Sequence, residues 1–204
     1  MKRKKVLRIL ISILGILVMD FGVGVLIKAN IGVDALNVFF TGVASELQVS
    51  VGTTTLLFNI VMLVVVLFID RKQIGVASLL ETLLCKFPLD FACQIIKTPK
   101  SVAGCVLLCL LAICTISLGV AMMMVSREGL CVYDALSSSI SNRYNLNYIM
   151  IRYICDGVYF LFGYLLKGQI GIGTIMCLLM FGTIINSFKT FLINIIQVDQ
   201  YYDS

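Results

Sequence analysis

The sequence predicts an all-α fold, a polytopic transmembrane helical bundle made of two repeated halves. Of the 204 residues, 60% are hydrophobic and 13% are charged, and the mean hydropathy of +1.03 is far above that of a soluble domain. Several apolar segments approach or exceed the roughly 20 residues that cross a bilayer core. The motif Asp34-Ala35-Leu36 also returns as Asp134-Ala135-Leu136, which indicates a duplicated unit.

The first apolar segment, residues 6–27, is expected to be an uncleaved transmembrane helix. It is longer than the apolar core of a signal peptide, contains Asp20 and ends without a small-residue cleavage site. The net charge of +5 comes largely from the basic cluster before it, Lys2, Arg3, Lys4, Lys5 and Arg8. Such a cluster predicts a cytoplasmic N-terminus, and we do not expect it to bind nucleic acid.

Four residues of this helix suggest how it packs. Gly15, Gly22 and Gly24 allow a second helix to approach closely, which is the usual role of glycine in a membrane bundle. Asp20 is expected to face the bundle interior or the membrane interface, because a carboxylate in hydrocarbon costs on the order of 3 kcal/mol.

The next segment, residues 34–47, is expected to be a half-helix or a membrane-surface helix. At a rise of about 1.5 Å per residue it reaches roughly 21 Å, which is short of the ~30 Å hydrocarbon core. It begins with Asp34 in an N-cap position and carries several polar residues, Asn37 among them.

Two more spans complete the first half. One ends at Ile69 and carries Asn59, and the other covers residues 74–96 after a charged loop. In the latter, Lys86 and Asp90 are four residues apart and are expected to pair along one helix face. Pro88 lies between them and is expected to kink the helix, because proline removes one backbone hydrogen bond.

The stretch Lys97-Thr98-Pro99-Lys100 divides a single membrane domain, residues 1–204, into two repeats, residues 6–96 and 101–196. Residues 1–5 and 197–204 are expected to be cytoplasmic tails. The elements predicted for the second repeat are a span at 102–125, a short segment at 134–141, and spans at 148–166 and 170–196.

The repeat can be followed at individual positions. Residues 73–78, Gln-Ile-Gly-Val-Ala-Ser, align with residues 169–174, Gln-Ile-Gly-Ile-Gly-Thr. Three pairs of polar residues also fall at matched positions: Asp34 with Asp134, Asn59 with Asp156, and Asp90 with Asn186. A period near 96 to 100 residues fits a duplicated membrane half better than a solenoid unit.

The short segments decide the topology. If they do not cross the membrane, each half has three spans and the halves are inserted in opposite orientations. If they do cross, the halves are parallel. The distribution of basic loop residues favours the inverted arrangement, because it places Arg71, Lys72, Arg127 and Arg143 on the cytoplasmic side.

Several short motifs resemble the YczE/YyaS/YitT family of bacterial membrane proteins. They are Gly22 and Gly24 leading to Gly32-Val33-Asp34-Ala35-Leu36, then Val51-Gly52-Thr53, Ile74-Gly75 and Pro88-Leu89-Asp90. The resemblance covers nearly the whole chain. It implies a protein of five or six spans in the bacterial cytoplasmic membrane, with no established biochemical activity to carry over. The chain is expected to follow the YczE branch, because a soluble C-terminal domain like that of the YitT branch is not seen.

An enzyme is not expected. The chain has no histidine, no nucleophile elbow and no phosphate-binding loop. Its eight cysteines lie within or beside apolar segments without a C-x-x-C motif, so we interpret them as packing residues. Neither a cofactor nor a metal is expected.

The sequence favours a small transporter or exporter of a small molecule or ion, because polar and ionisable residues inside spans mark transport pathways. The candidate binding residues are Asp34, Asn37, Asn59, Asp90, Asp134, Arg152, Asp156 and Asn186. The alternative function is a non-transporting membrane accessory protein that assists another protein or an export assembly. The expected partners are the lipid bilayer, the transported solute and a second copy of the chain.

Structural alternatives exist for three of these residues. Asp34 and Asp134 could serve as N-caps of helices at the lipid interface. Arg152 is expected to pair with Asp156 one turn away or to contact an anionic solute, and the alternative is a side chain that extends to the interface.

Overall fold

The computed structural model describes residues 2–129 and 131–196, with the side chains of 5–129 and 131–195. Within these ranges the secondary structure is nine α-helices and one short 3-10 helix, without strands, so the all-α prediction is confirmed. Four of the described helices are long and apolar enough to cross a membrane, which makes the chain a multi-pass membrane protein. They are α1 (Lys2–Ala29), α3 (Val51–Ile69), α6 (Val102–Ser126) and α9 (Ile172–Ile196). The predicted tail 197–204 lies outside the described residues.

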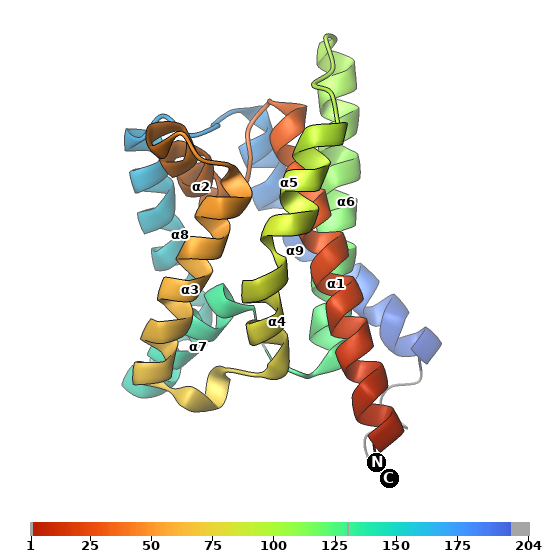
Figure 1. Ribbon diagram of the computed structural model, residues 1–204, viewed down its shortest axis with the longest axis vertical. Helices are drawn as coiled ribbons and strands as arrows, with labels where there is room; N and C mark the ends of the chain where they lie inside the picture. Colours follow the sequence, from red (N-terminus) through yellow and green to blue (C-terminus); the bar gives the residue numbers. More distant parts are fainter. Residues whose placement is uncertain (1, 130, 197–204) are drawn as a thin grey trace.

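The chain runs back and forth along the long axis of the bundle (Figure 1). α1 rises, α3 returns, and α4 (Val76–Leu84) and α5 (Lys86–Ile95) rise again one after the other. α6 then descends, α8 (Tyr148–Leu165) rises, and α9 descends. The start of α1 and the end of α9 therefore lie at the same end of the bundle.

Two short helices lie at opposite ends of the bundle, α2 (Ala35–Leu47) and α7 (Val132–Tyr144) (Figure 1). Each has 13 residues and reaches roughly 20 Å, too short for a full span. The short helix predicted at residues 34–47 is confirmed, with Asp34 as its N-cap. The predicted segment 134–141 is too short, because α7 begins earlier, at buried Val132, and continues until Asn145 adopts a left-handed conformation.

The helix predicted at 74–96 is broken where proline requires it. Cys85 separates α4 from α5, and Pro88 lies in the first turn of α5. Proline has no N–H to donate to the carbonyl of Leu84, and its ring crowds that carbonyl. The predicted kink is therefore confirmed.

α1 and α6 pack closely through glycine. A Cβ atom added at Gly119 would lie 2.6 Å from the carbonyl oxygen of Gly15, so the two backbones touch at this level. Nearer the end of the bundle where α1 begins, the hydroxyl of Ser12 donates a buried 2.7 Å hydrogen bond to Ser126. The predicted role of Gly15 as a packing residue is confirmed.

Each short helix packs mainly on a helix from the other half of the chain, α2 against α8 and α7 against α3. Backbone hydrogen bonds join the halves in the same crossed fashion. The N–H of Ala77 donates to the carbonyl of Glu128 at 3.1 Å, and the N–H of Gly173 donates to the carbonyl of Ile31 at 2.7 Å.

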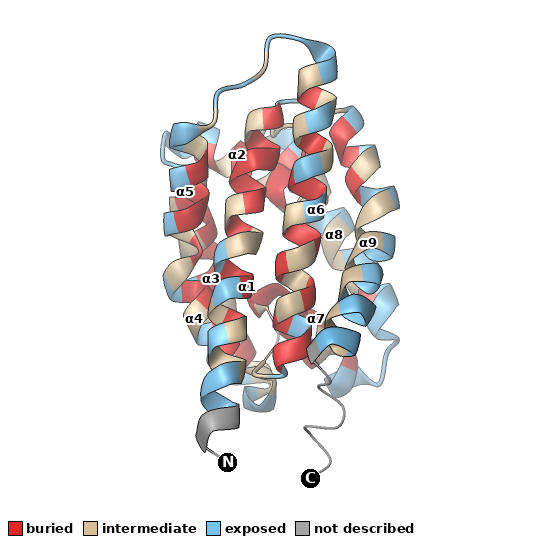
Figure 2. Cartoon of the chain, turned by 90° about the vertical axis from the view of Figure 1, so that its right-hand side faces the viewer, coloured by how far each residue is buried: buried red, intermediate tan, exposed pale blue. Residues whose placement is uncertain are grey.

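Burial separates the inside of the bundle from its surface (Figure 2). Leu26, Val38, Leu89 and Ile113 are fully buried and join α1, α2, α5 and α6 in the main core. The outer faces carry large apolar side chains, such as Phe68, which is 81% exposed. In a membrane bundle such side chains face lipid, so the apolar surface agrees with the composition.

Candidate functional site

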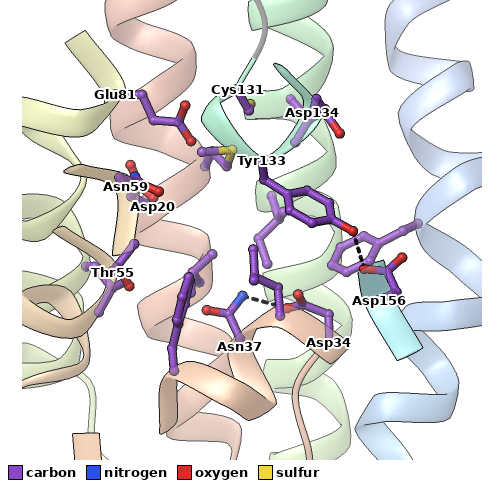
Figure 3. Close-up of a pocket in the computed structure, with 18 of the residues that line it drawn as sticks. Asp20, Asp34, Asn37, Thr55, Asn59, Glu81, Cys131, Tyr133, Asp134 and Asp156 are labelled. Carbon is purple, nitrogen blue, oxygen red and sulfur yellow. Dashed lines mark hydrogen bonds between the residues drawn. The ribbon is translucent and has the colours of Figure 1, made fainter. Parts of the chain in front are cut away.

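A cavity of about 200 Å³ lies inside the bundle. Every one of the nine described α-helices contributes to its lining. The polar and ionisable side chains that line it come mostly from segments that are apolar in sequence (Figure 3). They are Asp20, Asp34, Asn37, Thr55, Asn59, Glu81, Tyr133, Asp134, Arg152 and Asp156.

Asp34 enters the cavity from the start of α2. It occupies the N-cap position as predicted, but its side chain makes no capping hydrogen bond. Its carboxylate instead accepts a 2.7 Å hydrogen bond from the side-chain amide of Asn37 (Figure 3). Burial raises the pKa of the Asp34 carboxyl, and the hydrogen bond from Asn37 partly lowers that pKa again. A positive charge nearby would therefore stabilise the ionised form.

Asp134 has a different environment. It lies within the first turn of α7, whose N-cap is Cys131, so the N-cap interpretation is wrong for this residue. Its carboxylate pairs with the guanidinium of Arg152 and accepts a 3.2 Å hydrogen bond from the hydroxyl of Tyr148. Arg152 thus pairs with Asp134 and not, as predicted, with Asp156.

Asp156 forms a hydrogen bond with an aromatic residue instead of an ion pair with Arg152. The hydroxyl of Tyr133 donates a 2.7 Å hydrogen bond to its carboxylate (Figure 3). The ring of Tyr133 packs on Tyr159 at a centroid distance of 5.8 Å, and Tyr159 packs in turn on Phe58. The guanidinium of Arg152 lies 5.2 Å from the centroid of the Tyr133 ring, which is within range of a cation–π contact.

Two carboxylates in the cavity were not among the predicted site residues. Asp20 is only 4% exposed, and within the described part of the chain its Oδ2 atom has no hydrogen-bond partner. Glu81 accepts a 2.9 Å hydrogen bond from the backbone N–H of Val132, at the start of α7. The signal that could have identified both is a carboxylate inside an apolar segment. The prediction that Asp20 faces the interior is confirmed.

Six of the eight predicted site residues line this cavity, and two do not. Asp90 lies on α5 and faces the start of α3. It pairs with Lys86 at 2.9 Å and accepts hydrogen bonds from Ser50 and the Gly52 N–H. The predicted Lys86–Asp90 pair is therefore confirmed, and its contacts join α5 to α3. Asn186 lines a neighbouring hollow.

That second hollow has a volume of about 480 Å³ and lies among α6, α8 and α9. It shares Asp34, Asp134, Arg152 and Asp156 with the central cavity, so the two spaces adjoin. Lys189 also lines it and is exposed. The acidic cavity is thus bordered by a wider opening on the α9 side.

The comparisons with known proteins give relatives without a known activity. A family of unknown function, DUF6198, matches residues 6–190. The chain is 26% identical to an uncharacterized protein of Haemophilus influenzae over 195 residues, covering 96% of this chain and 85% of that protein. It is 20% identical to the uncharacterized protein YyaS of Bacillus subtilis over 178 residues, covering 86% and 89%. No solved structure matches the chain.

Proposed function

The chain belongs to DUF6198, a family of unknown function, and we propose that it is a small transporter of the bacterial cytoplasmic membrane. Because the family has no known activity, this function is inferred from the geometry of the chain. The similarity to YyaS confirms the resemblance to the YczE/YyaS/YitT family. The observation that carries the proposal is the cavity itself, a polar space inside an apolar bundle that every described α-helix helps to line. Sites of this kind, enclosed between two halves of a bundle, suit alternating access.

An inverted repeat is part of the proposal, and two glycine contacts support it. Gly75, before α4, meets Gly129, whose φ is +129°, and Gly171, before α9, meets Gly32, whose φ is +111°. In each case an added Cβ would lie 2.6 Å or less from backbone atoms across the contact. The two contacts correspond at spacings of 96 and 97 residues, so the same junction is built twice.

Side chains at the same junctions repeat this correspondence. The Gln73 side chain accepts a hydrogen bond from Ser138 of α7. Gln169 donates its backbone N–H to the hydroxyl of Thr41 in α2. Each glutamine thus holds the short helix of the opposite half at matched positions, although through different atoms. This is the arrangement that two interlocked, oppositely directed repeats would produce.

The distribution of charge supports a cytoplasmic N-terminus. The end of the bundle where α1 begins and α9 ends also holds η1 (Arg71–Gln73) and the C-terminal ends of α6 and α7, with Arg127 and Arg143 (Figure 1). The opposite end carries Lys28, Lys97, Lys100 and Lys167 in its loops and helix ends. Positive charge is thus concentrated at the end of the bundle where α1 begins, as expected for the cytoplasmic side.

In the proposed mechanism, the two halves rock against each other around the cavity. α2 and α7 each bind to the opposite half, so relative movement of the halves would shift both helices together. Asp34 and Asp134 lie in or beside these helices and line the cavity. Movement would therefore change the access to the site from one side of the membrane to the other.

A test that needs no known substrate is the accessibility of Thr55, which lines the cavity on α3. Thr55→Cys in a cysteine-free background should react with an impermeant thiol reagent both in intact cells and in inside-out vesicles. The matched control is Leu57→Cys on the same helix, where the side chain is 52% exposed on the lipid-facing surface. It should react from neither side, because a thiol in hydrocarbon does not ionise readily.

Reaction of Thr55→Cys from only one side, or from neither, would contradict alternating access and support the accessory role. Labelling of Gln73→Cys and Lys100→Cys tests the topology separately. The inverted arrangement requires Lys100→Cys, and not Gln73→Cys, to react in intact cells. The reverse result would show that the halves are parallel.

A further inference from the structure

We infer that the central cavity binds a small organic cation, an amine with a short apolar body. This inference rests on the proposed function, because it names the class of solute that the same site would carry. Five carboxylates line the cavity, and among the described lining residues Arg152 is the one basic side chain.

The ion pair accounts for only one of the five carboxylates that line the cavity. Arg152 pairs with Asp134, while the hydrogen-bond donors to Asp34, Glu81 and Asp156 are a side-chain amide, a backbone N–H and a phenol. All three donors are neutral. Carboxylates held together in a low-dielectric space repel one another, and a bound cation would remove that cost.

Asp20 gives the most direct sign of a binding site. Its side chain is nearly fully buried and lines the cavity, and its Oδ2 atom has no partner among the described residues. Asn59 and Thr55 lie beside it on the same side of the cavity (Figure 3). A buried acceptor of this kind is costly when unsatisfied, and an ammonium group supplies up to three donors.

The spacing of the acidic groups favours an organic cation over a metal ion. The described residues contain no group of three or more acidic, cysteine or histidine side chains that could hold a metal. The walls between the carboxylates are apolar, with Val23, Ile116 and Phe181 among them. The rings of Phe40 and Tyr133 also line the cavity, and aromatic faces attract cations. An alkylammonium ion matches both features.

The size of the cavity limits the ligand. A volume of about 200 Å³ corresponds to about seven water molecules at roughly 30 Å³ each. This space accommodates an amine with a chain of a few carbons and excludes large drugs or polymers.

The test compares three probes of equal chain length and different charge: n-butylamine, n-butanol and butyrate. The purified full-length protein in lipid nanodiscs is heated with each probe at the same ionic strength and pH. Butylamine should raise the unfolding midpoint in a concentration-dependent manner, as binding to the native state requires, and the other two should not. A response to butanol or butyrate equal to that of butylamine, or no response to butylamine, would overturn the inference.

Two isosteric variants locate the effect. Asp20→Asn removes one carboxylate from the cavity and should weaken the apparent affinity for butylamine roughly tenfold or more, as expected for a charged hydrogen bond between the ammonium group and that carboxylate. Asp90→Asn removes a carboxylate that pairs with Lys86 outside the cavity, so it should keep the wild-type affinity. Equal affinities in the two variants would place the amine elsewhere and overturn the inference.

Uptake by proteoliposomes separates this inference from the proposed function. Binding of butylamine without uptake would support the cation site and count against transport. Uptake of butyrate in preference to butylamine would support transport and overturn the cation site. Saturable uptake of butylamine that Asp20→Asn reduces would support both.

Discussion

The variant Gly119→Ala should destabilise the packing of α1 on α6. An added Cβ would lie 2.5 Å from the backbone nitrogen of Met19 and 2.6 Å from the carbonyl oxygen of Gly15. Both atoms belong to the backbone of α1, so no change of rotamer can relieve the contact. The two helices would have to separate instead.

The size of the effect follows from these distances. Ordinary van der Waals contact for a Cβ begins at 3.4 Å, so the backbones must separate by about 0.9 Å in a tightly packed interior. Overpacking of this kind costs roughly 1–3 kcal/mol. For a chain of this length, the unfolding midpoint should fall by roughly 2–12 °C.

Thermal unfolding in one detergent, followed by circular dichroism, measures this shift. Gly157→Ala is the matched control, because nothing lies within 4 Å of the position where its Cβ would be added. It should leave the midpoint unchanged or raise it slightly, since alanine favours helix by about 1 kcal/mol over glycine. A Gly119→Ala protein that unfolds at the wild-type temperature would refute the close α1–α6 contact.

Three further changes test buried contacts of the bundle by the same unfolding measurement. Arg152→Gln leaves the carboxylate of Asp134 without its ion pair and should cost roughly 1–3 kcal/mol, because the Arg152 side chain is 41% exposed; adding Asp134→Asn should recover part of that loss, and strictly additive losses would contradict the pair. Ser12→Ala removes the 2.7 Å hydrogen bond to Ser126 and should cost about 0.6 kcal/mol, whereas a stabilised variant would argue against this bond. Glu81→Gln keeps an acceptor for the first turn of α7 and should lose less stability than Glu81→Leu; the opposite order would exclude this capping role.

Features that depend on neighbours in sequence could be predicted from the sequence. Four of the six predicted long spans follow from apolar runs, and the short helix at 34–47 follows from its length and polar content. The break before Pro88 and the pairing of Lys86 with Asp90 follow from rules that act within one turn of helix. All of these were correct because no distant residue competes with them.

The partners inside the cavity could not be predicted in this way. Arg152 and Asp156 are four residues apart on α8, the spacing at which a helix forms ion pairs. In the folded chain, both residues have partners on α7 instead. The guanidinium of Arg152 pairs with Asp134, and the hydroxyl of Tyr133 donates a hydrogen bond to Asp156. These choices depend on how α7 packs against α8, which sequence spacing does not encode. The same holds for Asp20 and Glu81, whose common cavity requires α1 and α4 to meet.

The charge of the cavity comes from differences between the proposed repeats and not from the repeat itself. At a spacing of 97 residues, Arg152 and Asp156 of α8 correspond to Thr55 and Asn59 of α3, and all four line the cavity. At these positions the first half has neutral groups where the second half has charges. At the same spacing Asp134, which pairs with Arg152, corresponds to neutral Asn37.

This asymmetry would allow the proposed duplicated scaffold to serve a specific solute. Matched backbone junctions, such as Gly75 with Gly129 and Gly171 with Gly32, would allow the two halves to exchange conformations at similar energy. The unmatched side chains would select the cargo, because Asp20 corresponds to neutral Ser117 at the same spacing of 97 residues. Symmetric backbone contacts would therefore control access, and the divergent carboxylates would confer selectivity for a cation.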